Sequence, residues 1–140
     1  MNNLIKHITA ISKCKAFHIR HCYHLLKSYN DNDWKDYNYT VDDKDYYKIH
    51  IHSNDIFSLY LTNWKNDYLK ENINNLDGYL LKVLEGDLLA YTEKNKYDGI
   101  NIKQLYSQNN TFYTENNINF KIYSVGKTTS LHLVQNKIHL

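Results

Sequence analysis

Two histidines, His50 and His52, stand two residues apart in a stretch of alternating polar and apolar side chains. Residues two apart on a β-strand point to the same side, so both imidazoles would share a face with Lys48. Imidazole nitrogens are common metal ligands, and His132 would complete a three-nitrogen metal site. The alternative is an exposed polar face, or a partly buried pair bonded to its neighbours. We prefer this second interpretation.

A second group of potential ligands lies nearer the N-terminus, where His18, His21, Cys22 and His24 fall within seven residues. On a helix, residues 18, 21 and 22 would share one face. No second cluster at zinc-like spacing follows, so we interpret the segment as ordinary helix surface, with Cys22 as a small core residue. With Cys14 as the other cysteine, there is no disulfide framework, which favours a reducing setting.

Composition places the chain among globular proteins and argues against two kinds of partner. It has 140 residues, 23% charged and 42% hydrophobic, which is enough for one domain with a real core. The net charge is only +2 and both signs are interleaved, so we expect no nucleic-acid partner. There is no apolar run of membrane-spanning length and no leader pattern, so we expect no membrane partner and a cytoplasmic location.

The elements that must position these residues change type along the chain. Apolar residues recur at spacings of three and four from Leu4 to Leu26, which predicts one or two amphipathic helices. The polar stretch 28–33 ends that pattern as a surface connection. We therefore expect residues 1–33 to be a helical segment of the same domain that continues as a β body over residues 34–140.

The β body is indicated by a period of two that begins at Tyr46. A turn is expected at Glu85-Gly86. The spacing predicts a mainly β fold, an antiparallel barrel or sandwich, with the N-terminal helices packed on one side or end. The further short strands expected are 56–62, 79–84, 87–92, 102–106, 111–113, 118–123 and 130–134.

Residues 72–88 combine a polar loop, a strand of the type Leu-Lys-x-Leu and a glycine at Gly86. This order and spacing resemble the first cupin motif as the cysteine dioxygenase family carries it. In that family a His-x-His precedes the strand and binds iron. Asn72 and Asn74 occupy those positions here.

The resemblance extends upstream and downstream. Tyr46-Tyr47-Lys48 resembles a Tyr-Thr-Arg whose arginine grips the substrate carboxylate, and residues 57–64 are similar to a family strand that ends in Trp. Residues 109–121 are similar to the second cupin motif and put Lys121 at the third iron-ligand position. Ser130-Leu131-His132-Leu133-Val134 resembles Ser-Leu-His-Leu-Tyr. The match covers about residues 34–134 in the correct order and implies a cupin-type barrel.

The substitutions imply that the iron chemistry of the family is lost. The side chains of Asn72 and Asn74 offer neutral carbonyl oxygens, which suit hard cations better than iron, and the ammonium of Lys121 repels a cation. Tyr79 stands where the family cysteine that cross-links to a tyrosine usually sits. Val134 replaces that tyrosine, so neither half of the cross-link remains.

Two positively charged or donor groups of the resemblance do remain. Lys48 keeps the charge of the carboxylate-binding arginine without its two-pronged geometry. His132 resembles a family histidine that lies outside the iron's coordination sphere. Together with Lys121, these groups would be able to hold a small anionic ligand such as a carboxylate.

Three functions follow, and we prefer the first. It is a non-catalytic, cysteine-dioxygenase-like cupin without cofactor or catalytic residues, acting as a binding or structural module that joins a homo-oligomer or a protein partner. The second is an Fe²⁺-dependent thiol dioxygenase with unusual ligands, His50, His52 and His132. The third is a sensor of a small anionic ligand. Whether the chain is an enzyme stays open at this point.

Overall fold

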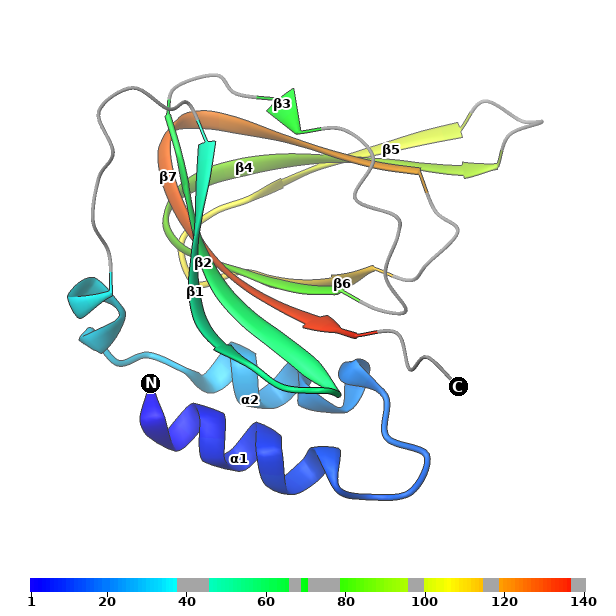
Figure 1. Ribbon diagram of the computed structural model, residues 1–140. Coiled ribbons are helices and arrows are strands. Elements are labelled where there is room, and N and C mark those ends of the chain that lie inside the picture. Colours follow the sequence, from blue (N-terminus) through cyan, green and yellow to red (C-terminus); the bar gives the residue numbers. More distant parts are fainter. Residues whose placement is uncertain (38–45, 66–68, 71–78, 96–99, 115–118, 137–140) are drawn as a thin grey trace.

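The computed structural model describes residues 1–37, 46–65, 69–70, 79–95, 100–114 and 119–136. The helical elements come first along the chain, as the apolar spacing predicts (Figure 1). Both α-helices lie on one side of the strands. These elements are α1 (Asn2–Ser12), the 3₁₀ turn η1 (Ile19–Cys22), α2 (Tyr23–Ser28) and the 3₁₀ turn η2 (Asp33–Asp36).

The strands form one antiparallel sheet in the order β1-β2-β7-β4-β5, with β3 also paired to β7 and β6 to β4. Within the described residues the sheet bends back over itself without closing into a barrel. The expectation of a mainly β fold with helices on one side is confirmed. The strands are β1 (Tyr46–Ser53), β2 (Phe57–Trp64), β3 (Leu69–Lys70), β4 (Tyr79–Asn95), β5 (Ile100–Tyr106), β6 (Thr111–Thr114) and β7 (Asn119–Gln135).

Two long strands, β4 and β7, run through both halves of the sheet. The expected turn at Glu85-Gly86 is wrong: β4 continues through it, with register shifts between Val83 and Asp87. Gly86 has φ +89°, and a Cβ there would lie 2.5 Å from the carbonyl oxygen of Lys127. The strand bends at this glycine. Only glycine fits there, because the partner strand passes too close to leave room for a side chain. The expected strands 118–123 and 130–134 are likewise the two ends of β7.

One side of the sheet, which we call the helix side, is a hydrocarbon core beneath α1 and α2. Leu131 and Leu133 of β7 are fully buried there, and Cys22 has no exposed surface, which confirms its interpretation as a core residue. Burying each such aliphatic side chain stabilises the fold by about 1.5–3 kcal/mol. The helix side is built mainly from Leu4, Ile8, Ile19, Leu26, Ile49, Phe57, Leu59, Leu61, Leu80, Leu131 and Leu133.

The opposite side, which we call the inner side, is enclosed by the bend of the sheet. Because side chains alternate along a strand, Ser130, His132 and Val134 of β7 point to this side, while Leu131 and Leu133 point to the helices. The inner side is richer in aromatic residues than the helix side. Its buried apolar members are Tyr60, Trp64, Tyr79, Leu81, Val83, Leu88, Ala90, Phe112, Ile122 and Val134.

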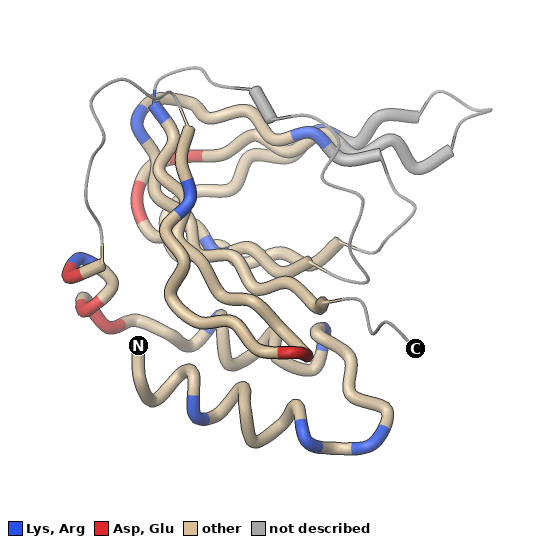
Figure 2. The backbone as a smooth tube through the Cα atoms, in the orientation of Figure 1, with Lys and Arg blue, Asp and Glu red and all other residues tan. Residues whose placement is uncertain are grey.

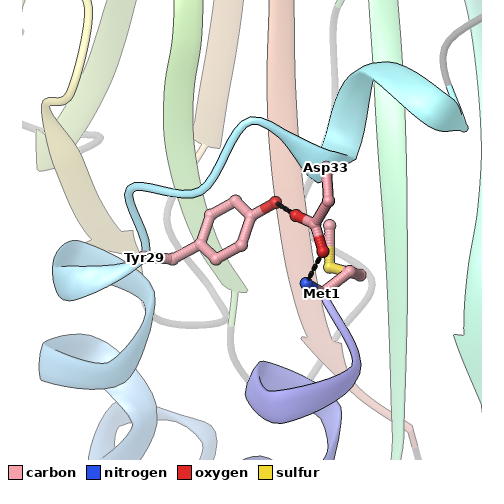
Figure 3. Close-up of polar contacts among 3 residues, drawn as sticks. All are labelled: Met1, Tyr29 and Asp33. Carbon is pink, nitrogen blue, oxygen red and sulfur yellow. Dashed lines mark hydrogen bonds and ion pairs between the residues drawn. The ribbon is translucent and has the colours of Figure 1, made fainter.

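Polar contacts hold the helical segment together and join it to the sheet. The hydroxyl of Tyr29 donates to one oxygen of Asp33, whose other oxygen pairs with the amino group of Met1 (Figure 3). Lys82 of β4 is 1% exposed, and its Nζ donates to the carbonyl oxygens of Lys27, at 2.9 Å, and Tyr29. Burial lowers the pKa of Lys82. The buried ammonium of Lys82 therefore supplies hydrogen bonds to carbonyl oxygens at the end of α2 that have no partner within the helix.

Candidate functional site

His132 lies at the centre of the inner side with no exposed surface. In the sheet it stands opposite Tyr60 on β2 and Leu81 on β4. The ring of Tyr60 stacks on the imidazole with centroids 4.9 Å apart and planes 17° apart. Tyr79 meets the imidazole edge-on at 5.3 Å, and Trp64 lies 6.4 Å away, nearly parallel. Aromatic rings thus enclose the histidine on several sides.

Both ring nitrogens of His132 are engaged by hydroxyl groups. Ser130 Oγ lies 2.6 Å from Nε2, and the hydroxyl of Tyr79 contacts Nδ1. The indole N–H of Trp64 donates to Ser130 Oγ at 2.8 Å, and Tyr79 donates in turn to Tyr60. If Ser130 donates to Nε2 and Nδ1–H donates to Tyr79, each donor in this series of hydrogen bonds, from Trp64 to Tyr79, has one acceptor. We call these five residues the His132 group.

The His132 group is electrically neutral near pH 7. Burial lowers the pKa of His132 well below its usual value, and the nearby ammonium of Lys48 lowers it further. Burial raises the pKa of Tyr79 well above its ordinary value. Burial also raises the pKa of Tyr60, although the hydrogen bond from Tyr79 opposes that shift. The group therefore offers neither a strong base nor an anion at physiological pH.

Lys48, a residue that the sequence analysis places at the site, lies beside the His132 group. It is exposed on β1, opposite Thr62, and its Nζ lies 4.3 Å from the centroid of the Tyr60 ring. A cation over a tyrosine ring is attracted by the ring's negative face. Lys48, Tyr79 and His132 are thus brought together around Tyr60.

Lys121, another position of the resemblance, is not brought to this group. Lys121 is exposed on β7 and stands opposite Tyr91, while its neighbour Ile122 is the residue buried on the inner side. Asn72 and Asn74 lie outside the described residues.

The His50 and His52 pair is separated by a β-bulge. The β1–β2 register shifts between them, so that His50 stands opposite Tyr60 and His52 opposite Leu59. Tyr60 belongs to the inner side and Leu59 to the helix side. The bulge removes the simple alternation on which a shared face depends. In the part of the chain that the structure describes, no three His, Cys, Asp or Glu side chains are grouped so that they could hold a metal ion.

The two positions that the resemblance aligns with the family's cross-link are direct neighbours across strands. Tyr79 on β4 stands opposite Val134 on β7. His132 lies two residues before Val134 on the same face of β7, so the phenol of Tyr79 is next to it. Ser130 and Trp64 were not predicted as partners of the histidine. The Ser-x-His spacing on a strand was the available signal, because residues two apart share a face.

A separate surface cleft of about 270 Å³ lies between the α2–η2 connection and the bend of β4. Its lining includes the amides of Asn30 and Gln108 and the carboxylates of Asp31 and Glu85. Asn109, also in the lining, has a left-handed backbone with φ 72°. No member of the His132 group lines this cleft.

Solved structures of similar shape have the cupin fold. A cupin superfamily protein from Desulfitobacterium hafniense DCB-2 matches with a TM-score of 0.57 at 10% identity, covering 66% of this chain and 78% of that chain. KdgF from a Halomonas species matches at 0.59 and 7% identity, covering 74% and 90%. An oxalate decarboxylase variant from Bacillus subtilis matches at 0.59 and 10% identity, covering 67% of this chain and 26% of its own. No protein-family model and no curated protein matches the chain.

These likenesses show that the chain has a cupin fold. Identities of about one residue in ten carry no function, since a shared fold hosts unrelated chemistries. Among the described residues, none of the helices combines the length and the apolar character that crossing a membrane requires.

Proposed function

We propose that this chain is a non-catalytic cupin, a binding or structural module whose interior is filled by the His132 group. The observation that carries the proposal is that both nitrogens of the buried imidazole are occupied by hydroxyls of Ser130 and Tyr79. Stacked Tyr60 and neighbouring Trp64 occupy the space beside the ring. The polar side chains that a reaction centre would use are instead hydrogen-bonded to one another and packed against aromatic rings.

The described donors do not fit an iron ion. A metal-bound imidazole must present a free nitrogen lone pair, and Nε2 of His132 lies 2.6 Å from Ser130 Oγ. Freeing it would leave a buried hydroxyl unpaired, at a cost of about 1–3 kcal/mol. His50 and His52, the other nitrogens considered, stand opposite residues on different sides of the sheet. Asn72 and Asn74, which the resemblance aligns with the family's iron-binding histidines, likewise have no imidazole to offer.

The test is metal binding and thiol oxidation by the full chain. The protein is expressed with added Fe²⁺, purified without oxygen, and its metal content is measured by mass spectrometry. Cysteine and related thiols are then supplied with oxygen, and sulfinic acid is sought by NMR. We expect far less than one iron per chain and no sulfinate. One iron per chain together with turnover would overturn the proposal.

Paired variants separate a relocated site from adventitious iron. His50→Ala removes an exposed imidazole that an iron site at His50, His52 and His132 would require. We expect the metal content of this variant to equal that of the wild type, with His24→Ala on exposed helix surface as the matched control. A loss of iron in His50→Ala but not in His24→Ala would support the enzyme hypothesis instead.

A second candidate function, recognition of a small anion, is favoured by the position of Lys48. Its ammonium is exposed, rests on Tyr60 and acts electrostatically on His132, so an anion bound there would be sensed by the His132 group. A thermal-shift screen with carboxylates and amino acids tests this, because a bound ligand stabilises the native state. The shift should vanish in Lys48→Met and persist in the Lys13→Met control. Equal shifts in both variants would contradict it.

A further inference from the structure

An apolar strip lies on the outer side of the sheet half formed by β5, the later part of β4 and the earlier part of β7. In this half Leu89 of β4 stands opposite both Leu105 and Tyr123. Leu105 is 54% exposed and Val125 43%, the two exposed large hydrophobic side chains among the described residues. The neighbours Leu88 and Ile122 are buried on the inner side, so alternation turns the strip outward.

No described helix covers this strip, because α1 and α2 pack against the other half of the sheet (Figure 1). A contiguous apolar patch that stays exposed marks an interaction surface in soluble proteins. We define the outer strip by the eight side chains that share this face: Asp87, Leu89, Tyr91, Lys103, Leu105, Lys121, Tyr123 and Val125.

Charges mark the two ends of the outer strip differently. Asp87 stands at one end, opposite Val125. Exposed Glu85 and Lys127 lie just beyond it with opposite charges. At the other end, Tyr91 stands opposite both Lys103 and Lys121, which are exposed, and Lys103 Nζ lies 5.6 Å from the Tyr91 ring centroid. Figure 2 shows both signs of charge on the strands of this half. The strip thus runs from an acid through leucines to two bases.

We propose that the outer strip binds a second copy of this chain, sheet against sheet, about a two-fold axis that lies between the sheets and runs across the strands. Two face-to-face arrangements with aligned strands place Leu89 of one copy on Leu89 of the other, and they differ in the direction of the two-fold axis. An axis along the strands would bring like-charged ends together. An axis across the strands places Asp87 of each copy over Tyr91 of the other, between Lys103 and Lys121. Charge complementarity selects the second arrangement.

The size of the outer strip sets the strength of this dimer. Eight side chains bury less than the roughly 1,200 Å² of total area that stable complexes need, so the dimer belongs to the weak class. We expect a dissociation constant on the order of 10–100 µM. The outer strip uses no member of the His132 group, so dimer formation is independent of the proposed function.

Sedimentation velocity of the full chain tests the proposal from about 5 to 500 µM, a range that spans the expected constant. The wild type should shift from monomer to dimer. Asp87→Lys alone, and Lys103→Asp combined with Lys121→Asp, should each weaken the dimer at least tenfold. An equal mixture of the two variants should restore it, because each supplies the charge that the other lacks. Lys13→Asp, on the exposed end of α1, should behave like the wild type.

A cross-linking experiment checks the direction of the axis and does not depend on charge variants. With the axis across the strands, Leu105 faces Leu105 of the other copy; with the axis along them, it faces Tyr123. Leu105→Cys in a Cys14→Ser background should therefore form covalent dimers with a bis-maleimide of about 10 Å, the spacing of packed sheets. A wild type that stays monomeric at the highest concentration, a charge mixture that fails to associate, or an absence of cross-links would each overturn the proposal.

Discussion

The two sides of the sheet are built from the same strands but hold together differently. On β7, Leu131 and Leu133 face the helices, while Ser130 and His132 face inward. The helix side is mostly hydrocarbon, with Lys82 as a buried charged exception whose partners are backbone carbonyls. The inner side has an apolar core too, but at its centre the side chains of the His132 group hydrogen-bond one another.

This difference predicts how each side responds to change. Hydrocarbon packing loses stability in proportion to the volume removed, and neighbours partly close the gap. A hydrogen-bonded chain of side chains leaves an unpaired buried group wherever it is cut. The helix side should therefore respond most to lost volume, and the inner side to lost single atoms and to pH.

The largest expected effect is on the helix side. Phe57 has no exposed surface, and Phe57→Ala should lower the free energy of unfolding by about 3–5 kcal/mol because it removes a buried ring and leaves a cavity. Phe57→Leu keeps most of the volume and should cost less than about 1.5 kcal/mol. Urea denaturation measures both. Equal losses for the two variants would show that volume is not the deciding quantity on this side.

The polar exception on the helix side should respond like the inner side. Lys82→Met keeps the volume but leaves the carbonyls of Lys27 and Tyr29 without their donor, and we expect a loss of about 2 kcal/mol. Lys27→Met, at an exposed position, should change stability by less than about 0.5 kcal/mol. A Lys82→Met variant as stable as the wild type would mean that the buried charge costs as much as its hydrogen bonds return.

The inner side should make stability depend on pH. Because burial and Lys48 lower the pKa of His132 in the folded state, the unfolded chain binds the extra proton first. The stabilisation that comes from keeping His132 neutral is complete above about pH 6.5 and is lost as the pH falls below it. The free energy of unfolding should then fall by up to about 1.4 kcal/mol per pH unit. Urea denaturation between pH 7.5 and 5.0 should show a smaller slope in His132→Gln. Parallel slopes would contradict a buried neutral imidazole.

The smallest expected effect concerns one oxygen atom. Tyr79→Phe removes the hydroxyl from Nδ1 of His132 and should cost about 1 kcal/mol, with no change in packing. Tyr91→Phe, on the outer strip, is the matched control and should stay within about 0.5 kcal/mol. Thermal unfolding at low protein concentration distinguishes the two. If both variants behave alike, the hydrogen-bonded chain does not stabilise the inner side.

Much of the fold was predictable because alternation and helical spacing are local patterns. The strand that begins at Tyr46 and the helices between Leu4 and Leu26 are present as expected. The bend at Gly86 and the bulge after His50 were not, because both depend on how close the partner strand passes. Periodicity within one strand carries no information on that distance.

The candidate site was predictable only in part. His132, Tyr79 and Lys48 were identified through a resemblance, and the structure gathers them around Tyr60. The hydrogen bond from Trp64 to Ser130 joins residues 66 positions apart. Such a contact follows from the register of β2 against β7, which the sequence pattern leaves undetermined.

The continuity of β4 and β7 limits how this molecule can be divided. Each is 17 residues long and contributes to both halves of the bent sheet, with Gly86 at the corner. A fragment that contains only one half would cut both strands, so we expect neither half to fold when it is produced or exchanged alone. Selection must act on the whole sheet as a single unit, and a lesion at the corner would disturb both halves at once.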